Sequence, residues 1–149
     1  MRNNLPTRKK IRLQDYDYAE ENIYFITICV KDRLEILGKI IEDNIKLTKE
    51  GEIVKKNINK IEQIYENVTI DEYVIMPNHM HILLQINYKS SATISKIIKH
   101  LKTNITRKIE YSIWQKSFYE HIIRNERDYL KVKDYIKNNV INWEKDKYF

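Results

Sequence analysis

The sequence contains few glycine and proline residues, which are typical of turns and loops, and little cysteine, which forms disulfide crosslinks. Its 149 residues include 2 glycines, 2 prolines and a single cysteine, Cys29. With so few glycines, the chain has no glycine-rich phosphate loop and no dinucleotide fingerprint, which argues against a nucleotide-dependent small-molecule enzyme. One cysteine excludes a disulfide framework, so we expect Cys29 to be a small core residue in a reducing cytoplasm.

Long apolar runs are missing as well. No uninterrupted apolar stretch approaches the length of a membrane span, and no signal-peptide core follows the basic N-terminus. We therefore expect a soluble, cytoplasmic protein with no membrane contact. The length favours a single domain. We divide it into a basic arm (1–20), a segment of strands and a helix (21–90), and a segment with a basic helix, an edge and a last helix (91–149).

Positive charge is in excess and is unevenly distributed. The chain has 27 Lys and Arg residues against 21 Asp and Glu, a net charge of +6 and a pI of about 9.2, which favours a polyanionic partner. Residues 1–14 and 93–109 contain basic residues and no acid. Each block alone is equally consistent with a solvated, lysine-rich face.

Hydrophobic periodicity predicts an α+β fold. We expect strands at 23–30, 68–76 and 79–86, a hairpin of 34–41 with 44–47, helices at 48–65, 94–109 and 125–139, and an aromatic edge at 114–123. Thr48, Thr93 and Asn125 are the expected N-caps, Asn125 in a reciprocal cap with Asp128. The expected buried stripe of the first helix is Ile53, Val54, Ile58, Ile61 and Ile64, and the apolar residues at helical spacing in the second are Ile94, Ile97, Ile98, Leu101 and Ile105. The residues expected to span the last helix are Tyr129, Leu130, Val132, Ile136 and Asn139. This order describes a ferredoxin-like sandwich, a mainly antiparallel sheet with helices packed on one side and a last helix at the C-terminus.

Two histidines stand out within the expected strand 79–86. His79 and His81 are two residues apart and therefore point to the same face of a strand, where two imidazoles can bind one divalent ion. The alternative is a structural role, in which both histidines are half-buried and make their hydrogen bonds within the protein. Tyr135 and Asn139 lie four residues apart on the expected last helix, so a nucleophile and a third ligand could arrive from one helical face.

Several motifs combine in a diagnostic order. They are Lys-Ile-Arg-Leu at 10–13, Tyr-Phe-Ile-Thr-Ile-Cys at 24–29, Met-Pro-Asn-His-Met-His at 76–81, Trp-Gln at 114–115, Tyr-Glu-His-Ile-Ile-Arg at 119–124 and Asp-Tyr-Ile at 134–136. A His-x-His pair alone is common, whereas the combination is specific. On these motifs the chain resembles the REP-associated tyrosine transposases, members of the HUH single-tyrosine nuclease superfamily.

The resemblance implies an enzyme, a metal-dependent transposase and strand-transferase. Tyr135 would be its nucleophile, and His79, His81 and Asn139 would hold a divalent ion, Mg²⁺ or Mn²⁺. The reaction would cleave and rejoin single-stranded DNA or palindromic repeat hairpins through a 5′-phosphotyrosine. The protein would be a monomer or homodimer, nucleoid-associated when bound to DNA. Candidate DNA contacts are Lys10, Arg12, Lys99, Lys102, Arg107 and Arg124.

One departure from the family pattern leaves other functions open. Asn139 is followed by Val140, where the family usually has proline, so Asn138 is a possible substitute ligand. The first alternative is a DNA-hairpin-binding protein whose catalytic site has decayed. The second is a hydrolytic nuclease in which the histidines activate water and Tyr135 only packs.

Each residue around the aromatic edge could have either a structural or a functional role. For His121, a structural role in the aromatic edge is favoured over a proton carrier or phosphate contact. Core packing is likewise the default for Trp114, Phe118 and Tyr119, although each could stack on an unpaired base.

Overall fold

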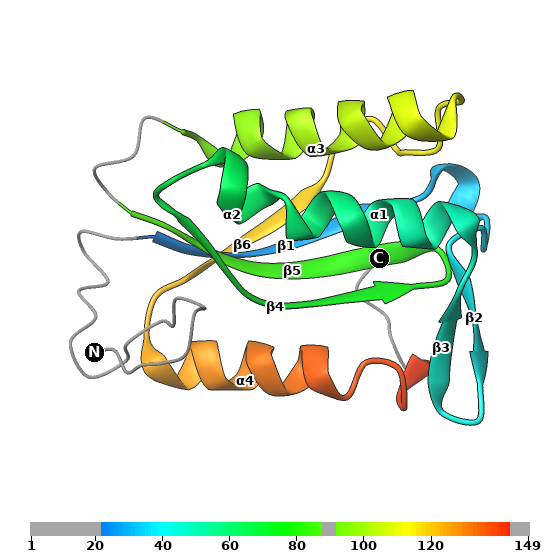
Figure 1. Cartoon of the computed structure of the whole chain (residues 1–149). Helices are drawn as coiled ribbons and strands as arrows, with labels where there is room; N and C mark the ends of the chain where they lie inside the picture. The colour runs from blue at the N-terminus through cyan, green and yellow to red at the C-terminus, as the bar shows by residue number, and fades with distance from the viewer. Residues whose placement is uncertain (1–21, 88–91, 144–149) are drawn as a thin grey trace.

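The computed structural model describes residues 22–87 and 92–143, which form a four-stranded sheet with helices on both faces and a separate hairpin (Figure 1). In chain order the elements are β1 (Asn22–Cys29), the 3₁₀ turn η1 (Lys31–Arg33), β2 (Gly38–Ile41), β3 (Asn44–Leu47), α1 (Lys49–Asn59), α2 (Ile61–Ile64), β4 (Val68–Met76), β5 (His79–Ile86), α3 (Ile94–Ile109), β6 (Tyr119–Ile123) and α4 (Glu126–Lys137).

The main sheet has the strand order β4-β5-β1-β6, and each of these pairs is antiparallel. The path β1-α1-β4-β5-α3-β6 is the βαββαβ connectivity of a ferredoxin-like fold. β4 and β5 are joined by the two-residue turn Pro77-Asn78, as the sequence predicted. The predicted fold class is confirmed.

Each long helix begins at the predicted cap. The side-chain oxygen of Thr48 accepts a hydrogen bond from Gly51 N at 3.1 Å, and that of Thr93 accepts one from Lys96 N at 3.2 Å. The side chain of Asn125 accepts from Asp128 N at 2.9 Å. These bonds satisfy backbone donors that the first helical turn leaves without a partner.

Two apolar layers cover the sheet, one on each face. The larger core packs α1 and α3 against Ile26, Ile82 and their neighbours on one face. The smaller core packs α4 against Ile23, Phe25 and their neighbours on the other face (Figure 1). The expectation that all helices share one side is therefore wrong in this detail. β1 is apolar on both faces, and each face needs a helical cover.

One residue assigned to a buried stripe is on the surface, and so is one of the residues expected to span the last helix. The expected helix 48–65 breaks at Lys60, so α2 is a separate single turn and Ile64 is 55% exposed. Leu130 in α4 is 50% exposed. The other members are buried or partly buried, including the complete α3 stripe. Among the described helices, none is both long and apolar enough to cross a membrane.

The close approach of α1 to the Leu37 carbonyl gives a stability prediction. A Cβ at position 51 would overlap that carbonyl oxygen, which already accepts a hydrogen bond from Thr48 N at 3.0 Å. Alanine normally stabilises a helix relative to glycine by about 1 kcal/mol. We expect Gly51→Ala to destabilise instead, by about 1–3 kcal/mol, because backbone must move. Urea unfolding measures the change.

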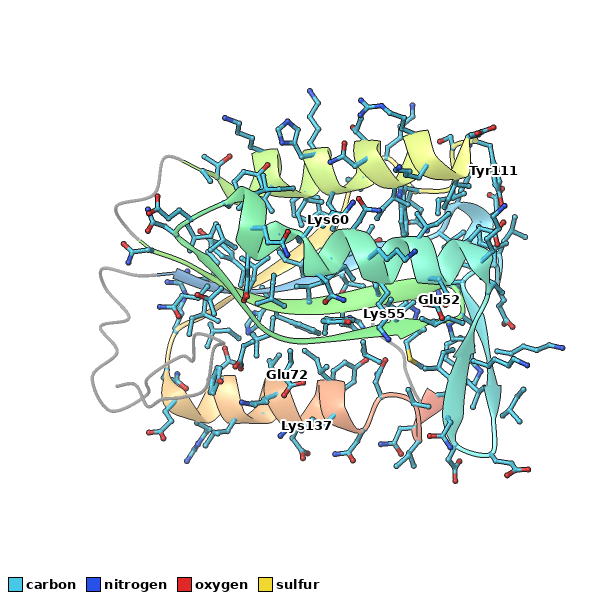
Figure 2. The ribbon with its side chains drawn as sticks, in the orientation of Figure 1. Glu52, Lys55, Lys60, Glu72, Tyr111 and Lys137 are labelled. Carbon is cyan, nitrogen blue, oxygen red and sulfur yellow. The ribbon has the colours of Figure 1, made fainter. Side chains whose placement is uncertain are left out.

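The matched control is Lys55→Ala, an exposed position on the same helix (Figure 2). It should change stability by less than about 0.5 kcal/mol. A Gly51→Ala protein as stable as the parent would show that α1 does not pack as closely on Leu37 as described.

Candidate metal and nucleophile site

His79 and His81 lie at the start of β5 on the face covered by α4. Both side chains are fully buried, and their ring centroids are 4.7 Å apart. Their cross-strand neighbours in β1 are Cys29 and Thr27. The spacing prediction that the two imidazoles share one face is confirmed.

Each imidazole is oriented by a hydrogen bond at Nδ1. His79 Nδ1 donates to Asn78 Oδ1 at 2.7 Å, and His81 Nδ1 lies 2.8 Å from the Thr27 hydroxyl oxygen. A neutral ring that donates from Nδ1 carries its lone pair on Nε2, the usual arrangement in metal-binding histidines. Thr27 was not singled out from the sequence. Its only signal there is a hydroxyl inside an otherwise apolar strand.

α4 and the turn after it bring aromatic rings to both histidines. The Tyr135 ring lies 5.4 Å from that of His81 and 6.0 Å from that of Phe25. Trp143 stacks on His79 at 6.1 Å with an angle of 18° between the rings. Tyr135 therefore meets the histidine pair of its own chain. Trp143 is a contact that the sequence analysis missed.

Asn139 lies just after α4, not within it. The helix ends at Lys137, and a tight turn follows in which Asn139 N donates to Ile136 O at 3.2 Å. Asn139 is 1% exposed, and its amide oxygen and nitrogen have no hydrogen-bond partner among residues 22–87 and 92–143. Leaving a buried amide without a partner costs about 1–3 kcal/mol, and such a group is a candidate ligand for an ion.

The neighbouring amide is already engaged. Asn138 caps α4 and donates to Asp134 O at 3.0 Å and to Asp134 Oδ1 at 3.1 Å. The geometry therefore favours Asn139 over Asn138 as the third ligand. α4 also ends here although Val140 stands where the family usually has proline.

The donor set fits a divalent ion. Asn139 lies midway in the chain between Tyr135 and Trp143, whose rings contact the two histidines. The described residues hold no cluster of three or more His, Cys, Asp or Glu side chains suited to a metal, so an ion at the histidine pair would need a third protein ligand of another kind, such as an amide. Two imidazoles and an amide oxygen suit Mn²⁺ at least as well as Mg²⁺.

A β-bulge fastens α4 to the sheet. The pairing of β4 with β5 shifts between Ile70 and Glu72, which leaves Asp71 as an extra residue in β4. The Asp71 carboxylate accepts a hydrogen bond from the Tyr129 hydroxyl and lies 3.4 Å from Lys133 Nζ. Glu72 makes a longer, more exposed pair with Lys137 at 4.0 Å (Figure 2). The bulge directs the Asp71 carboxylate toward α4.

The predicted DNA contacts are spread over the molecule. Lys10 and Arg12 lie outside the described residues. Lys99 and Arg107 are exposed on α3, which packs on the sheet face opposite the histidines. Arg124 is exposed just before α4. Lys102 is half-buried, and burial lowers its pKa; its Nζ donates to the carbonyl oxygens of Gln115 and Lys116 at 2.8 and 3.3 Å.

A hollow of about 440 Å³ lies beside α3. Its lining consists of basic, hydroxyl, amide and indole side chains without a carboxylate: Lys102, Thr103, Thr106, Arg107, Ser112, Trp114, Gln115 and Lys116. Trp114 itself is 5% exposed and belongs to the core, which agrees with the core packing favoured by the sequence analysis. Such a lining suits an anion.

Residues 19–139 match the family model described as "Transposase IS200 like". The chain belongs to this family. The match includes His79, His81, Tyr135 and Asn139, the four strands of the main sheet and the three long helices up to the end of α4. The family resemblance read from the motifs is therefore confirmed.

Relatives of this IS200-like transposase agree with that assignment. It is 38% identical to an uncharacterized protein of Haemophilus influenzae, over 95% of this chain and 93% of the relative. It is 27% identical to the REP-associated tyrosine transposase of Escherichia coli K12, over 83% of this chain and 69% of the relative. A solved REP-associated tyrosine transposase bound to a REP hairpin has the same fold, with a TM-score of 0.66, 23% identity and coverage of 94% of this chain and 74% of that one. Together these support a transposase of the HUH type.

The Asp71 contact predicts how firmly α4 is held. We expect Asp71→Ala to cost about 1–3 kcal/mol and to speed amide exchange along α4, because the Tyr129 hydroxyl loses its charged acceptor. Hydrogen exchange with thermal unfolding measures both effects.

The neighbouring substitution Glu72→Ala is the control. Its ion pair with Lys137 is long and more exposed, so it should cost less than about 1 kcal/mol. Equal protection of α4 in both variants would contradict the assignment of Asp71 as its anchor.

Proposed function

We propose that this transposase cleaves and rejoins single-stranded DNA at repeat hairpins through a covalent bond to Tyr135. The observation that carries the proposal is a set of three features at the histidine face of the sheet and the end of α4. These are a buried imidazole pair, a tyrosine against one of its rings, and an orphaned buried amide from the same helix end. The family match adds the reaction class.

His79, His81 and Asn139 would hold the divalent ion. When bound, such an ion withdraws charge from phosphate oxygens and so stabilises the charge that develops during attack. Asn78 and Thr27 would keep the two rings in the orientation that offers Nε2. Trp143 and Phe25 would exclude water from the two sides of the pair.

Tyr135 would supply the nucleophile. Its phenol oxygen attacks phosphorus and gives up its proton, the bond from phosphorus to the 3′ oxygen breaks, and that oxygen leaves as a hydroxyl. The products are a 5′-phosphotyrosine and a free 3′ end. Attack by another 3′-hydroxyl reverses the step and rejoins DNA, so no nucleotide cofactor is needed.

Basic surfaces would hold the rest of the DNA. A hairpin partner is supported by the solved relative that is bound to a REP hairpin. The carboxylate-free hollow beside α3 could seat backbone phosphates, with Lys99 nearby on the same helix. Contacts of this kind give affinity that falls with salt and depends little on sequence.

The nucleophile can be tested directly. Labelled hairpin oligonucleotides with Mn²⁺ should form a covalent adduct on the Tyr135 peptide, seen by denaturing gel and mass spectrometry. We expect no adduct with Tyr135→Phe or with EDTA, and unchanged hairpin binding in the Phe variant.

Tyr111→Phe is the matched control. Tyr111 is an exposed tyrosine at the end of α3, away from α4 (Figure 2), and its loss should leave adduct formation intact. Cleavage that persists in Tyr135→Phe would favour the hydrolytic nuclease. Hairpin binding without an adduct on any substrate would favour the decayed binding protein.

The third ligand can be tested without DNA. We expect Asn139→Ala to weaken Mn²⁺ binding at least tenfold, as measured by titration calorimetry, because an amide oxygen is lost from the set. The metal-free variant should be no less stable than the parent, since an orphaned amide leaves the core. Asn138→Ala is the control and should keep its Mn²⁺ affinity. The reverse pattern would move the ligand to Asn138.

A further inference from the structure

A second hollow lies between β6 and α4, on the same sheet face as the histidines. It has a volume of about 470 Å³, within the usual range of small-ligand pockets. Tyr135 and Thr27 are part of its wall. Tyr135 is the proposed nucleophile, and Thr27 contacts His81, so the hollow adjoins the site where the scissile phosphate would lie.

The rim of this hollow is built from β6. Tyr119 and His121 are paired with Thr27 and Phe25 of β1, so both side chains project toward α4. Tyr119 is 57% exposed. His121 Nε2 lies 2.8 Å from Asp128 Oδ2 on α4, which bridges the two elements. The His121 side chain is 55% exposed, and its contact with Asp128 is consistent with the structural role that the sequence analysis favoured.

The lining suits an uncharged planar group better than a phosphate. Its charged side chains on this face are Lys131 and Asp128, and Glu120 faces the other side of the sheet, paired with Ile26. This lining therefore lacks the positive excess of the hollow beside α3. Exposed tyrosines next to a backbone path commonly stack unpaired bases, with little dependence on which base is present.

We propose that this hollow binds the unpaired nucleobase next to the scissile phosphate, stacked on Tyr119. The assignment rests on the proposed function, because that function places DNA against Tyr135. Base capture would hold the flexible single strand so that its phosphate stays in front of the nucleophile. His121, held by Asp128, would offer Nδ1 as the polar contact to the base edge. Tyr119 and His121 would then be positioning residues.

The test uses the Tyr135→Phe protein, which should bind DNA without cleaving it. Hairpin oligonucleotides with an unpaired oligo-dT flank carry one 5-iodo-deoxyuridine, moved one position at a time, and are irradiated after binding. Mass spectrometry then locates the crosslinked peptide. We expect one flank position to crosslink within residues 119–131, and Tyr119→Ala to abolish that crosslink and weaken binding about tenfold.

Three comparisons separate stacking from other effects. Tyr119→Phe keeps the ring and should retain the crosslink and the affinity. Tyr111→Ala removes an equally exposed tyrosine at the end of α3 and should change neither. Bound DNA that never crosslinks within 119–131, or unchanged crosslinking in Tyr119→Ala, would overturn the proposal. So would a failure of the oligonucleotides to bind.

The outcome is independent of the cleavage assay. An adduct on Tyr135 together with crosslinks only at α3 would leave the proposed function standing and remove the base pocket. Crosslinks to Tyr119 without any adduct would support the pocket in a protein that binds but does not cleave.

Discussion

The apolar contact between α4 and the sheet is the constraint on which the histidine site depends. Without it, the Tyr135 ring would not contact His81 on β5. Burial of each large aliphatic side chain contributes about 1.5–3 kcal/mol, whereas the Lys137–Glu72 pair contributes less than about 1 kcal/mol. Apolar burial therefore decides that α4 docks. The contacts of Asp71 with Tyr129 and Lys133 then fix the position of α4 along the sheet. The residues of this contact are Ile23, Phe25, Leu83, Ile123, Tyr129, Val132 and Ile136.

Burial of the two imidazoles is tolerated because each is hydrogen-bonded. A buried polar group without a partner is expensive, and the bonds to Asn78 and Thr27 remove much of that cost. Asn139 lacks such a partner. Among the described residues, the buried side-chain atoms without a hydrogen-bond partner are the two amide atoms of Asn139 and Trp114 Nε1. An amide left in this state at the end of the helix that brings Tyr135 to His81 is consistent with a preorganised ligand. A residue selected only for packing at that position would be apolar.

Sequence reasoning succeeded where the signal is local. Caps at Thr48, Thr93 and Asn125 and the turn before His79 depend on residues within one helical turn or one hairpin, and all were confirmed. The choice of sheet face for α4 was not predictable in this way, because β1 in the middle of the sheet is mainly apolar on both faces. Local pattern also placed Asn139 on the helix, although α4 ends two residues earlier.

Contacts between distant segments escaped prediction for a related reason. Thr27 and His81 are 54 positions apart, and Asp71 and Tyr129 are 58 apart. Each partner is an ordinary residue in its own segment, so only the register of strands and the docking of α4 reveal the pair. The bulge at Asp71 is the sharpest case, because one extra residue changes the face on which a carboxylate appears.

The two hollows lie on opposite faces of the sheet, and one short segment connects them. Residues 114–116 line the hollow beside α3, and residues 119–121 line the one beside α4. A hairpin stem held by the basic hollow would therefore send its single strand around the β6 edge to reach Tyr135. The first three of the five β6 residues are polar and exposed, which leaves that route open and also discourages pairing with another chain. β6 would then be the sheet edge around which the single strand turns to reach Tyr135.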